Sequence, residues 1–286
     1  MSDFVRHNAV ATDFATSDSW VILSPIEQSI KRKIEAVGTP LKDWDIQINY
    51  GIKTGYNEAF IITTEKRNEI LSNCADEDER KRTDELIRPI LRGRDIKRYG
   101  YDWANLWLIN THNGIKGKLD RIHIEDYPAV KAHLDQYWDK IATRADKGDT
   151  PYNLRNCAYL DDFSKPKIVW KRIGSILRFS YDDKGCFGLD STCFASGSQL
   201  AYLACVLNSK IGHYLLKDSP CTGTGDLLIS VQAIEPLKIP MAQNDSFDEL
   251  LSRILSGSED GETIAFHEIS DLYGFNQEER EYILMK

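Results

Sequence analysis

One segment constrains the fold more than any other, because its apolar side chains recur at every second position. It spans residues 41–51, LKDWDIQINYG. The alternating apolar residues are Trp44, Ile46, Ile48 and Tyr50. A period of two predicts a strand with one buried face. The following GIKTG (51–55) predicts a glycine turn, and residues 57–63 are expected to begin a second strand, so that the turn closes a hairpin.

The rest of the chain alternates between segments of helical and of strand character. Ser24 and Pro25 predict the start of a helix that Gly38 ends, because serine caps helices and proline fits their first turn. Further helices are expected over residues 63–72, 77–91, 127–148, 196–217 (broken near Asn208 and Ser209), 246–255 and 266–286. Further strands are expected over residues 5–23, 97–112, 165–173, 176–183, 185–190, 191–196 and 236–240.

The glycines of GIKTG raise the question of a nucleotide enzyme. A phosphate-binding loop requires G-x-x-x-x-G-K-[ST] between a strand and a helix. In this chain the lysine precedes the second glycine, and a strand is expected to follow. The chain also lacks the Pro-Pro pair and the glycine-rich cofactor turn of adenine methyltransferases. We therefore predict that the chain has no catalytic centre of its own.

Metal sites are not expected either. The six cysteines include no C-x-x-C pair and the six histidines no H-x-x-x-H pair, which argues against zinc. Two loose groupings of acids and lysines resemble parts of a magnesium nuclease site. The first comprises Asp161, Asp162, Lys165 and Lys167, and the second comprises Glu125, Asp126 and Lys131. Such spacings also arise by chance in a charged protein.

Location follows from two features of the sequence. No apolar run approaches the ~18 residues that a membrane helix needs. The first residues, MSDFVRHNAVATDF, lack the layout of a signal peptide. We expect a cytoplasmic protein that has no membrane partner.

The net charge of −8 is concentrated near the C-terminus. Residues 241–286 hold 11 acidic and 3 basic side chains, whereas residues 1–240 hold 33 of each sign. Because salt screens charges beyond about 10 Å, a basic cluster in the larger part can still bind nucleic acid. We predict one domain over residues 1–242 and an acidic helical extension, residues 243–286, that packs on it.

Two clusters within residues 1–240 combine cations with aromatic side chains. Residues 80–101 carry eight basic and three acidic side chains, and residues 163–184 carry six and two. Arginine binds phosphate or guanine through paired hydrogen bonds, and aromatic rings stack on bases. The clusters indicate nucleic-acid binding or, as an alternative, solvated charged faces beside core aromatics.

An ordered set of motifs joins these signals. The set consists of G-x-x-T-G-x-N-x-A-F (51–60), R-G-x-D-I-x-R-Y (92–99), a helix that begins Tyr-Pro (127–128), K-P-K-I (165–168) and L-N-S (207–209). In this order, from about residue 24 to the C-terminus, the chain resembles the TaqI-like C-terminal specificity domain. That domain is the target recognition domain of adenine-N6 DNA methyltransferases and of type IIG restriction-modification enzymes.

The resemblance implies a fold, a function and partners. The fold is α+β, a twisted mixed sheet flanked by helices with a helical C-terminal portion. The function is sequence-specific recognition of double-stranded DNA on behalf of an adenine-N6 methyltransferase or restriction endonuclease, and the domain itself is not an enzyme. S-adenosylmethionine and magnesium are expected only in the methyltransferase and nuclease domains, which are supplied in cis or in trans. No cofactor is expected in this chain.

The resemblance and the basic clusters together select the candidate DNA contacts. They are Lys53, Thr54, Tyr56, Asn57, Arg92, Arg94, Lys97, Arg98, Asn113, Lys116, Lys118, Lys171 and Arg172. Gly51, Gly55 and Gly93 are predicted to form turns, Asn57 to brace its turn as an alternative, and Asp95 to pair with one arginine. Base readers are expected in residues 111–121, which include His112, and in residues 171–175.

Two other functions fit the same sequence. One is a protein-interaction subunit of a phage-defence system that docks through the acidic tail. The other is a divergent magnesium-dependent nuclease that uses Asp161, Asp162 and Lys165. Binding to duplex DNA that weakens with salt would separate the recognition domain from the first alternative.

Overall fold

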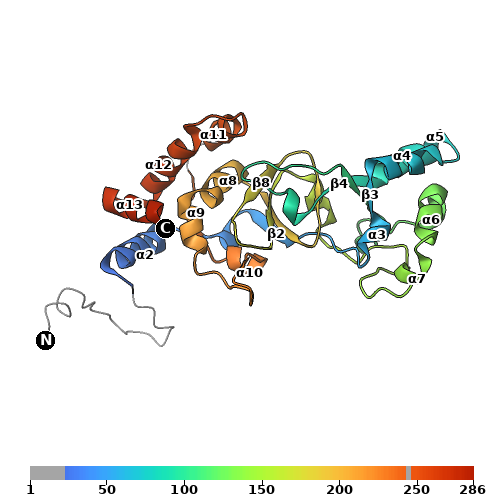
Figure 1. Cartoon of the computed structure of the whole chain (residues 1–286), viewed down its shortest axis with the longest axis horizontal. Helices are drawn as coiled ribbons and strands as arrows, with labels where there is room; N and C mark the ends of the chain where they lie inside the picture. Colours follow the sequence, from blue (N-terminus) through green and yellow to red (C-terminus); the bar gives the residue numbers. More distant parts are fainter. Residues whose placement is uncertain (1–22, 243–245) are drawn as a thin grey trace.

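The computed structural model describes residues 23–242 and 246–286, so the strand predicted over residues 5–23 lies almost wholly outside the described part. The molecule is elongated (Figure 1). Helix α2 (Pro25–Val37) and the C-terminal helices form one end, the sheets form the middle, and helices α3 to α7 form the other end. The fold is α+β, as predicted.

A four-stranded antiparallel sheet occupies the centre. Its strands, in spatial order, are β2 (Ile46–Tyr50), β10 (Thr192–Gly197), β6 (Lys167–Lys171) and β8 (Phe179–Asp182). Phe194 of β10 lies opposite Asn49 on one side and Val169 on the other. The strand predicted from the period-two segment is therefore confirmed as β2.

The two faces of this sheet belong to two different hydrophobic cores. Ile168 and Trp170 point into the first core, and Val169 between them points into the second. On β10, Cys193 and Ala195 face the first core and Phe194 the second. Successive side chains of a strand point to opposite faces, so a strand that is buried on both faces reads as a continuous apolar run.

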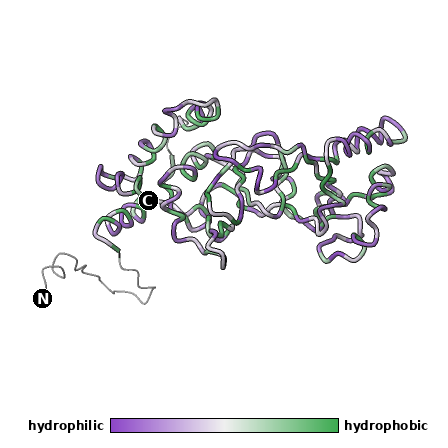
Figure 2. The backbone as a smooth tube through the Cα atoms, viewed as in Figure 1, coloured by the Kyte–Doolittle hydropathy of each residue, from purple (hydrophilic) through white to green (hydrophobic). Residues whose placement is uncertain are grey.

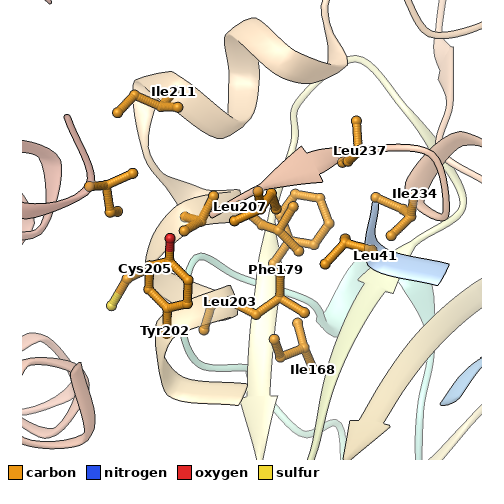
Figure 3. Close-up of a cluster of buried hydrophobic side chains, with 14 of the residues drawn as sticks. Leu41, Ile168, Phe179, Tyr202, Leu203, Cys205, Leu207, Ile211, Ile234 and Leu237 are labelled. Carbon is orange, nitrogen blue, oxygen red and sulfur yellow. The ribbon is translucent and has the colours of Figure 1, made fainter. Parts of the chain in front are cut away.

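The first core is formed by the sheet and by helices from both ends of the chain. These helices are α2, α8 (Leu200–Asn208), α9 (Lys210–Leu216), α11 (Ser246–Leu255), α12 (Gly261–Tyr273) and α13 (Gln277–Met285). All nine residues of α8 are buried. Figure 3 shows its Leu203 and Leu207 beside Ile168 and Phe179 of the sheet. Leu237 and Ile234 close this core from the segment of α10 (Val231–Ile234) and β12 (Lys238–Ile239).

Local signals fixed several helix ends correctly. Ser24 caps α2 in a capping box with Glu27, and Pro25 is its first residue. The predicted break near Asn208 and Ser209 separates α8 from α9, where extended Ser209 accepts a hydrogen bond from Gly212 N.

Residues of the acidic segment, among them Phe247, Leu250 and Ile269, are part of the first core.

The second core lies under a second sheet and a group of helices. The strand order is β3 (Ile61–Thr63), β5 (Leu106–Ile109), β4 (Ile87–Leu91) and β9 (Phe187–Gly188), and β4 and β9 are parallel. The helices are α3 (Asn57–Phe60), α4 (Thr64–Ser72), α5 (Glu77–Leu86), α6 (Pro128–Asp135) and α7 (Trp138–Ile141). Shorter pairs join β1 (Thr39–Pro40) to β12, and β7 (Ile173–Gly174) to β11 (Leu227–Leu228).

Several predicted elements were wrong, and the helix expected over residues 266–286 is interrupted at Gly274, between α12 and α13. Strands β2 and β3 belong to different sheets, so GIKTG connects two sheets and is not a hairpin turn, and the short helix α3 follows it. The helix expected over residues 77–91 ends at Leu86, because residues 87–91 pair with β5 and β9 as β4. The single helix expected over 127–148 is broken into α6 and α7.

Hydrophobic and hydrophilic residues are intermixed along the elements (Figure 2). No helix within the described residues is both long enough and apolar enough to cross a membrane.

Candidate nucleic-acid interface

A pocket of about 620 Å³ opens where GIKTG leaves the central sheet. Four segments that are distant in sequence line it: residues 50–53 at the end of β2, residues 155–159 before β6, Arg172 after β6, and Asp190 before β10. Tyr50 and Tyr159 supply aromatic surface, and Lys53, Arg155 and Arg172 supply positive charge. The pocket therefore offers both stacking surface and donors for an anionic ligand.

The glycines of GIKTG have different reasons for being glycine. A Cβ on Gly51 would lie 1.9 Å from the carbonyl oxygen of Leu189, so the strand can approach β9 only without a side chain there. The amide of Ile52 donates to Gly188 O at 2.7 Å in this contact. Gly55 has a φ of +72°, which favours glycine. Gly93, from the other glycine motif, lies against Lys171, since a Cβ there would be 2.9 Å from Lys171 Cγ.

Lys53 is exposed at the pocket edge and forms an ion pair with Asp146 at 2.7 Å. Arg155 approaches the same carboxylate at 3.3 Å. The hydrogen bond from Lys53 lowers the pKa of Asp146, and the charge of Arg155 adds to that effect. Arg155 was not among the predicted contacts. Its signal was available in residues 152–159, YNLRNCAY, where it is the only basic residue.

The next residues of the GIKTG motif brace the loop. Thr54 is buried, and its hydroxyl donates to Asn57 Oδ1 at 2.5 Å. The phenol of Tyr56 donates to Glu58. Thr54 thus has an internal hydrogen bond, and Asn57 lies in the bracing position that we named as its alternative. The DNA contacts predicted for both residues stay predictions.

A second pocket, of about 640 Å³, adjoins the first. Its lining comes from residues 113–117, 119–121, Asp149 and 156–158, and Asn156 and Cys157 line both pockets. Asn113 braces this region by donating to Asp149 Oδ1 at 3.0 Å and accepting from Asp149 N at 2.8 Å. Lys116 is exposed at the rim, while Lys118 forms an ion pair with Asp161. His112 is held inside, where its Nδ1 accepts from Gly114 N at 3.2 Å.

Four of the predicted cations have no acidic partner among the described residues. They are Arg94, Lys116, Lys171 and Arg172. Arg172 lines the first pocket, and its Nε is buried with no hydrogen-bond partner among the described residues. Lys171 is adjacent to it and in contact with Gly93, whose amide donates to Ser191 Oγ at 3.1 Å. Arg94 is exposed beside this contact.

Comparison with known proteins gives a family match for part of the chain. Residues 88–227 match the sequence profile of the TaqI-like C-terminal specificity domain. Over these residues, which are just under half of the chain, it is similar to this specificity domain. The matched range includes Arg94, Lys116, Lys171 and Arg172, together with most of the central sheet.

The likeness of this fold to a solved structure extends beyond the matched residues. The type IIL restriction-modification enzyme MmeI, solved in complex with DNA, superposes with a TM-score of 0.59 at 11% identity over 87% of this chain. The type IIG restriction endonuclease BpuSI aligns with a TM-score of 0.45 at 14% identity over 87% of this chain. This chain spans 37% and 33% of the length of those two proteins.

The R-G-x-D-I-x-R-Y motif of the specificity domain divides into paired and unpaired cations. Arg92 donates to Asp95 at 3.0 and 2.7 Å, as predicted for one arginine, and this bonding raises the pKa of Arg92. Lys97 pairs with Asp102 at 3.2 Å. Arg98 points to the C-terminal helices, where it donates to Glu262 at 2.7 Å and Asn208 O at 2.9 Å. Of the four cations predicted in this motif, only Arg94 is unpaired among the residues that the structure describes.

The alternative nuclease site gains no support. Asp161 pairs with Lys118, and Asp162 pairs with Lys165 at 2.7 Å. Within residues 23–242 and 246–286, no group of three or more histidine, cysteine or acidic side chains is placed to hold a metal ion.

Proposed function

We propose that this chain recognises a specific sequence in double-stranded DNA and thereby directs the catalytic part of a restriction-modification enzyme. One observation carries the proposal. Two adjoining pockets bring together cations from segments distant in sequence, and two of these cations, Arg172 and Lys116, have no acidic partner among the described residues. Arg94 and Lys171, which line neither pocket, have no acidic partner in the described chain either. Cations without partners are available to phosphates and to base edges.

The side chains divide by the contact that each can make. Lys116, Lys171 and Arg94 are exposed and suit the phosphate backbone, where each contact releases counterions and makes binding salt-dependent. Arg172 is half-buried in the lining of the first pocket, and its planar guanidinium suits paired hydrogen bonds to guanine O6 and N7. Arg172 is therefore our candidate base reader.

The acidic C-terminal segment does not oppose this function. Helices α11 to α13 lie at the end of the molecule beyond α8 and α9, whereas α6 and α7 mark the opposite end (Figure 1). Screening limits the reach of their charge to about 10 Å at 0.1 M salt. The acids of this segment also neutralise Arg98 through Glu262.

The proposal includes the partners of the chain. The expected partner is an adenine-N6 methyltransferase domain, with or without a nuclease domain, in the same or a separate polypeptide. S-adenosylmethionine and magnesium would bind to those domains, and this chain would supply recognition without catalysis. We place the complex in the cytoplasm.

The test is selection of bound duplexes from a random-sequence library at roughly 50 mM and roughly 200 mM salt, followed by sequencing. The chain is used alone and together with its catalytic partner. Enrichment of one short motif at both salt concentrations supports the proposal. Retention without any motif, or no retention in either form, contradicts it.

A further inference from the structure

Arg144 is buried, with 7% of its surface exposed, and does not itself line the first pocket. Its guanidinium spans two segments. Nη1 donates to Thr54 O, while Nη2 donates to Asn153 O at 2.5 Å and Pro151 O at 3.1 Å. The guanidinium carbon lies 4.2 Å from the centre of the Phe60 ring. One side chain thus ties the GIKTG loop to the loop after α7.

These two segments carry the two cations that share Asp146. Lys53 immediately precedes Thr54, and Arg155 follows Asn153 by two residues. Both line the first pocket, and both reach the Asp146 carboxylate. Because two cations share one carboxylate, the three side chains keep a net charge of +1 that is open to an anion. The spacing between the Lys53 and Arg155 backbones is therefore set by the hydrogen bonds of Arg144.

We propose that Arg144 is a positioning residue for DNA recognition: without touching DNA, it holds Lys53 and Arg155 at the spacing that the pocket requires. This inference rests on the proposed function. The burial of Arg144 rules out direct contact in this conformation, so any effect on binding acts through the two loops. Burial lowers the pKa of Arg144 to about 10, so the guanidinium remains charged at neutral pH.

The chemistry of the site requires a guanidinium. Burying a charge is unfavourable, and an apolar side chain of similar size would give comparable stability in many proteins. A lysine ammonium is a point charge on a flexible stem, whereas the planar fork of arginine presents donors in fixed directions to several carbonyls at once. Arg144→Lys therefore keeps the charge and removes the fixed link between the loops.

The experiment compares Arg144→Lys with a matched control, Arg67→Lys. The Arg67 guanidinium also lies 4.2 Å from an aromatic ring centre, that of Trp107, but it lines neither pocket. Binding of the duplex selected by the wild-type chain is measured over a range of salt concentrations. Arg144→Lys is expected to bind about tenfold more weakly, a change of about 1.4 kcal/mol. Its salt slope should fall by about 1 to 2 as the contacts of Lys53 and Arg155 weaken.

A double-mutant cycle separates positioning from general loss of structure. In the Lys53→Gln/Arg155→Gln background, Arg144→Lys should change affinity by less than about twofold, because the groups through which it acts are gone. A tenfold further loss in that background, or an unchanged affinity of Arg144→Lys in the otherwise wild-type chain, overturns the inference. If the wild-type chain selects no duplex, it is the proposed function that fails.

A measurement on the wild-type chain covers the case in which Arg144→Lys does not fold. Amide hydrogen exchange is followed with and without the selected duplex. Because Arg144 links the loops, residues 52–55 and 151–156 should gain protection together, and α4 should not change. Protection of one loop without the other overturns the inference.

Discussion

Lys167 Nζ lies 2.5 Å from Asp182 Oδ2, and both side chains are fully buried at the centre of the molecule. The pair joins β6 to β8 across the central sheet. Asp182 also accepts hydrogen bonds from the phenol of Tyr101 and the amide of Cys186, each at 2.9 Å. Lys167 donates in addition to Phe163 O at 2.6 Å. The carboxylate therefore anchors the turn that leads into β9.

Removing one partner of this pair should strongly destabilise the domain. Lys167→Met leaves the Asp182 carboxylate buried without its counter-charge, and we expect the free energy of unfolding to fall by about 3–5 kcal/mol. Lys165→Met is the control, because Lys165 is exposed, and its pair with Asp162 should contribute less than about 1 kcal/mol. Urea unfolding measures both. Equal losses for the two variants would show that the buried pair has no special role.

Arg94 and Arg98 belong to one motif and should differ in their effect on DNA. Arg94→Gln is expected to weaken binding to all sequences and to reduce the salt slope by about 1, because an unpaired cation is lost. Arg98→Gln should leave binding within about twofold of wild type, because its guanidinium already donates hydrogen bonds to the Glu262 carboxylate and to the Asn208 carbonyl oxygen. Fluorescence anisotropy with specific and scrambled duplexes measures both. A larger loss for Arg98→Gln would place the DNA on the other side of the motif.

Arg172 should affect specificity more than general affinity. Arg172→Gln is expected to remove about 1–3 kcal/mol of discrimination at one base pair of the site and to relax preference there. Lys171→Gln, one residue earlier and exposed, is the control and should weaken all sequences alike. The random-library selection is repeated with each variant. An unchanged motif with Arg172→Gln would remove this residue from the list of base readers.

Gly51 should not tolerate even a methyl group. Gly51→Ala places a Cβ 1.9 Å from Leu189 O, so β2 and the β9 segment must move apart. We expect a loss of about 1–3 kcal/mol in stability, together with weaker DNA binding, since Gly51 and Ile52 line the first pocket. Gly223→Ala, where a Cβ would meet nothing within 4 Å, is the control. Thermal unfolding and anisotropy report the two effects, and a stable Gly51→Ala protein would contradict the close contact.

Three partly or fully buried histidines should make stability depend on pH near neutrality. Burial lowers the pKa of His112, His133 and His213, so between the folded and unfolded pKa values the unfolded chain binds more protons. Their contribution is complete above about pH 6.5 and is lost as the pH falls toward the folded pKa. The shifted carboxylates, such as Glu27 and Asp146, act at lower pH.

The test compares urea unfolding at pH 7.5 and pH 5.5. The wild-type chain should be less stable at pH 5.5. His133→Gln should reduce the difference between the two values, because one group that must be neutral in the folded state is gone. His123→Gln, at an exposed position, should not alter the difference. If the wild-type chain is equally stable at both pH values, protonation of these histidines does not lower the free energy of unfolding, and the prediction is wrong.

The sequence correctly predicted those elements that depend on residues close to each other along the chain. The capping box of Ser24 and Glu27, the break at Ser209 and the period of two in β2 all depend on residues within a few positions of each other. Strand β4 was misread as the end of a helix, because Ile87, Ile90 and Leu91 adopt strand geometry only through pairing with β5 and β9. Pro89, which has no N–H, lies in the part of β4 that pairs with β5 alone.

The sequence by itself determined that the chain is α+β, that it resembles a TaqI-like specificity domain, and which segments concentrate its cations. Only the tertiary structure decided which of those cations are free. Lys53 meets Asp146 and Arg98 meets Glu262 across long stretches of chain, whereas Arg94, Lys116, Lys171 and Arg172 meet no acid among the described residues. The physical reason is that an ion pair depends on distance in space, which folding sets independently of distance along the chain.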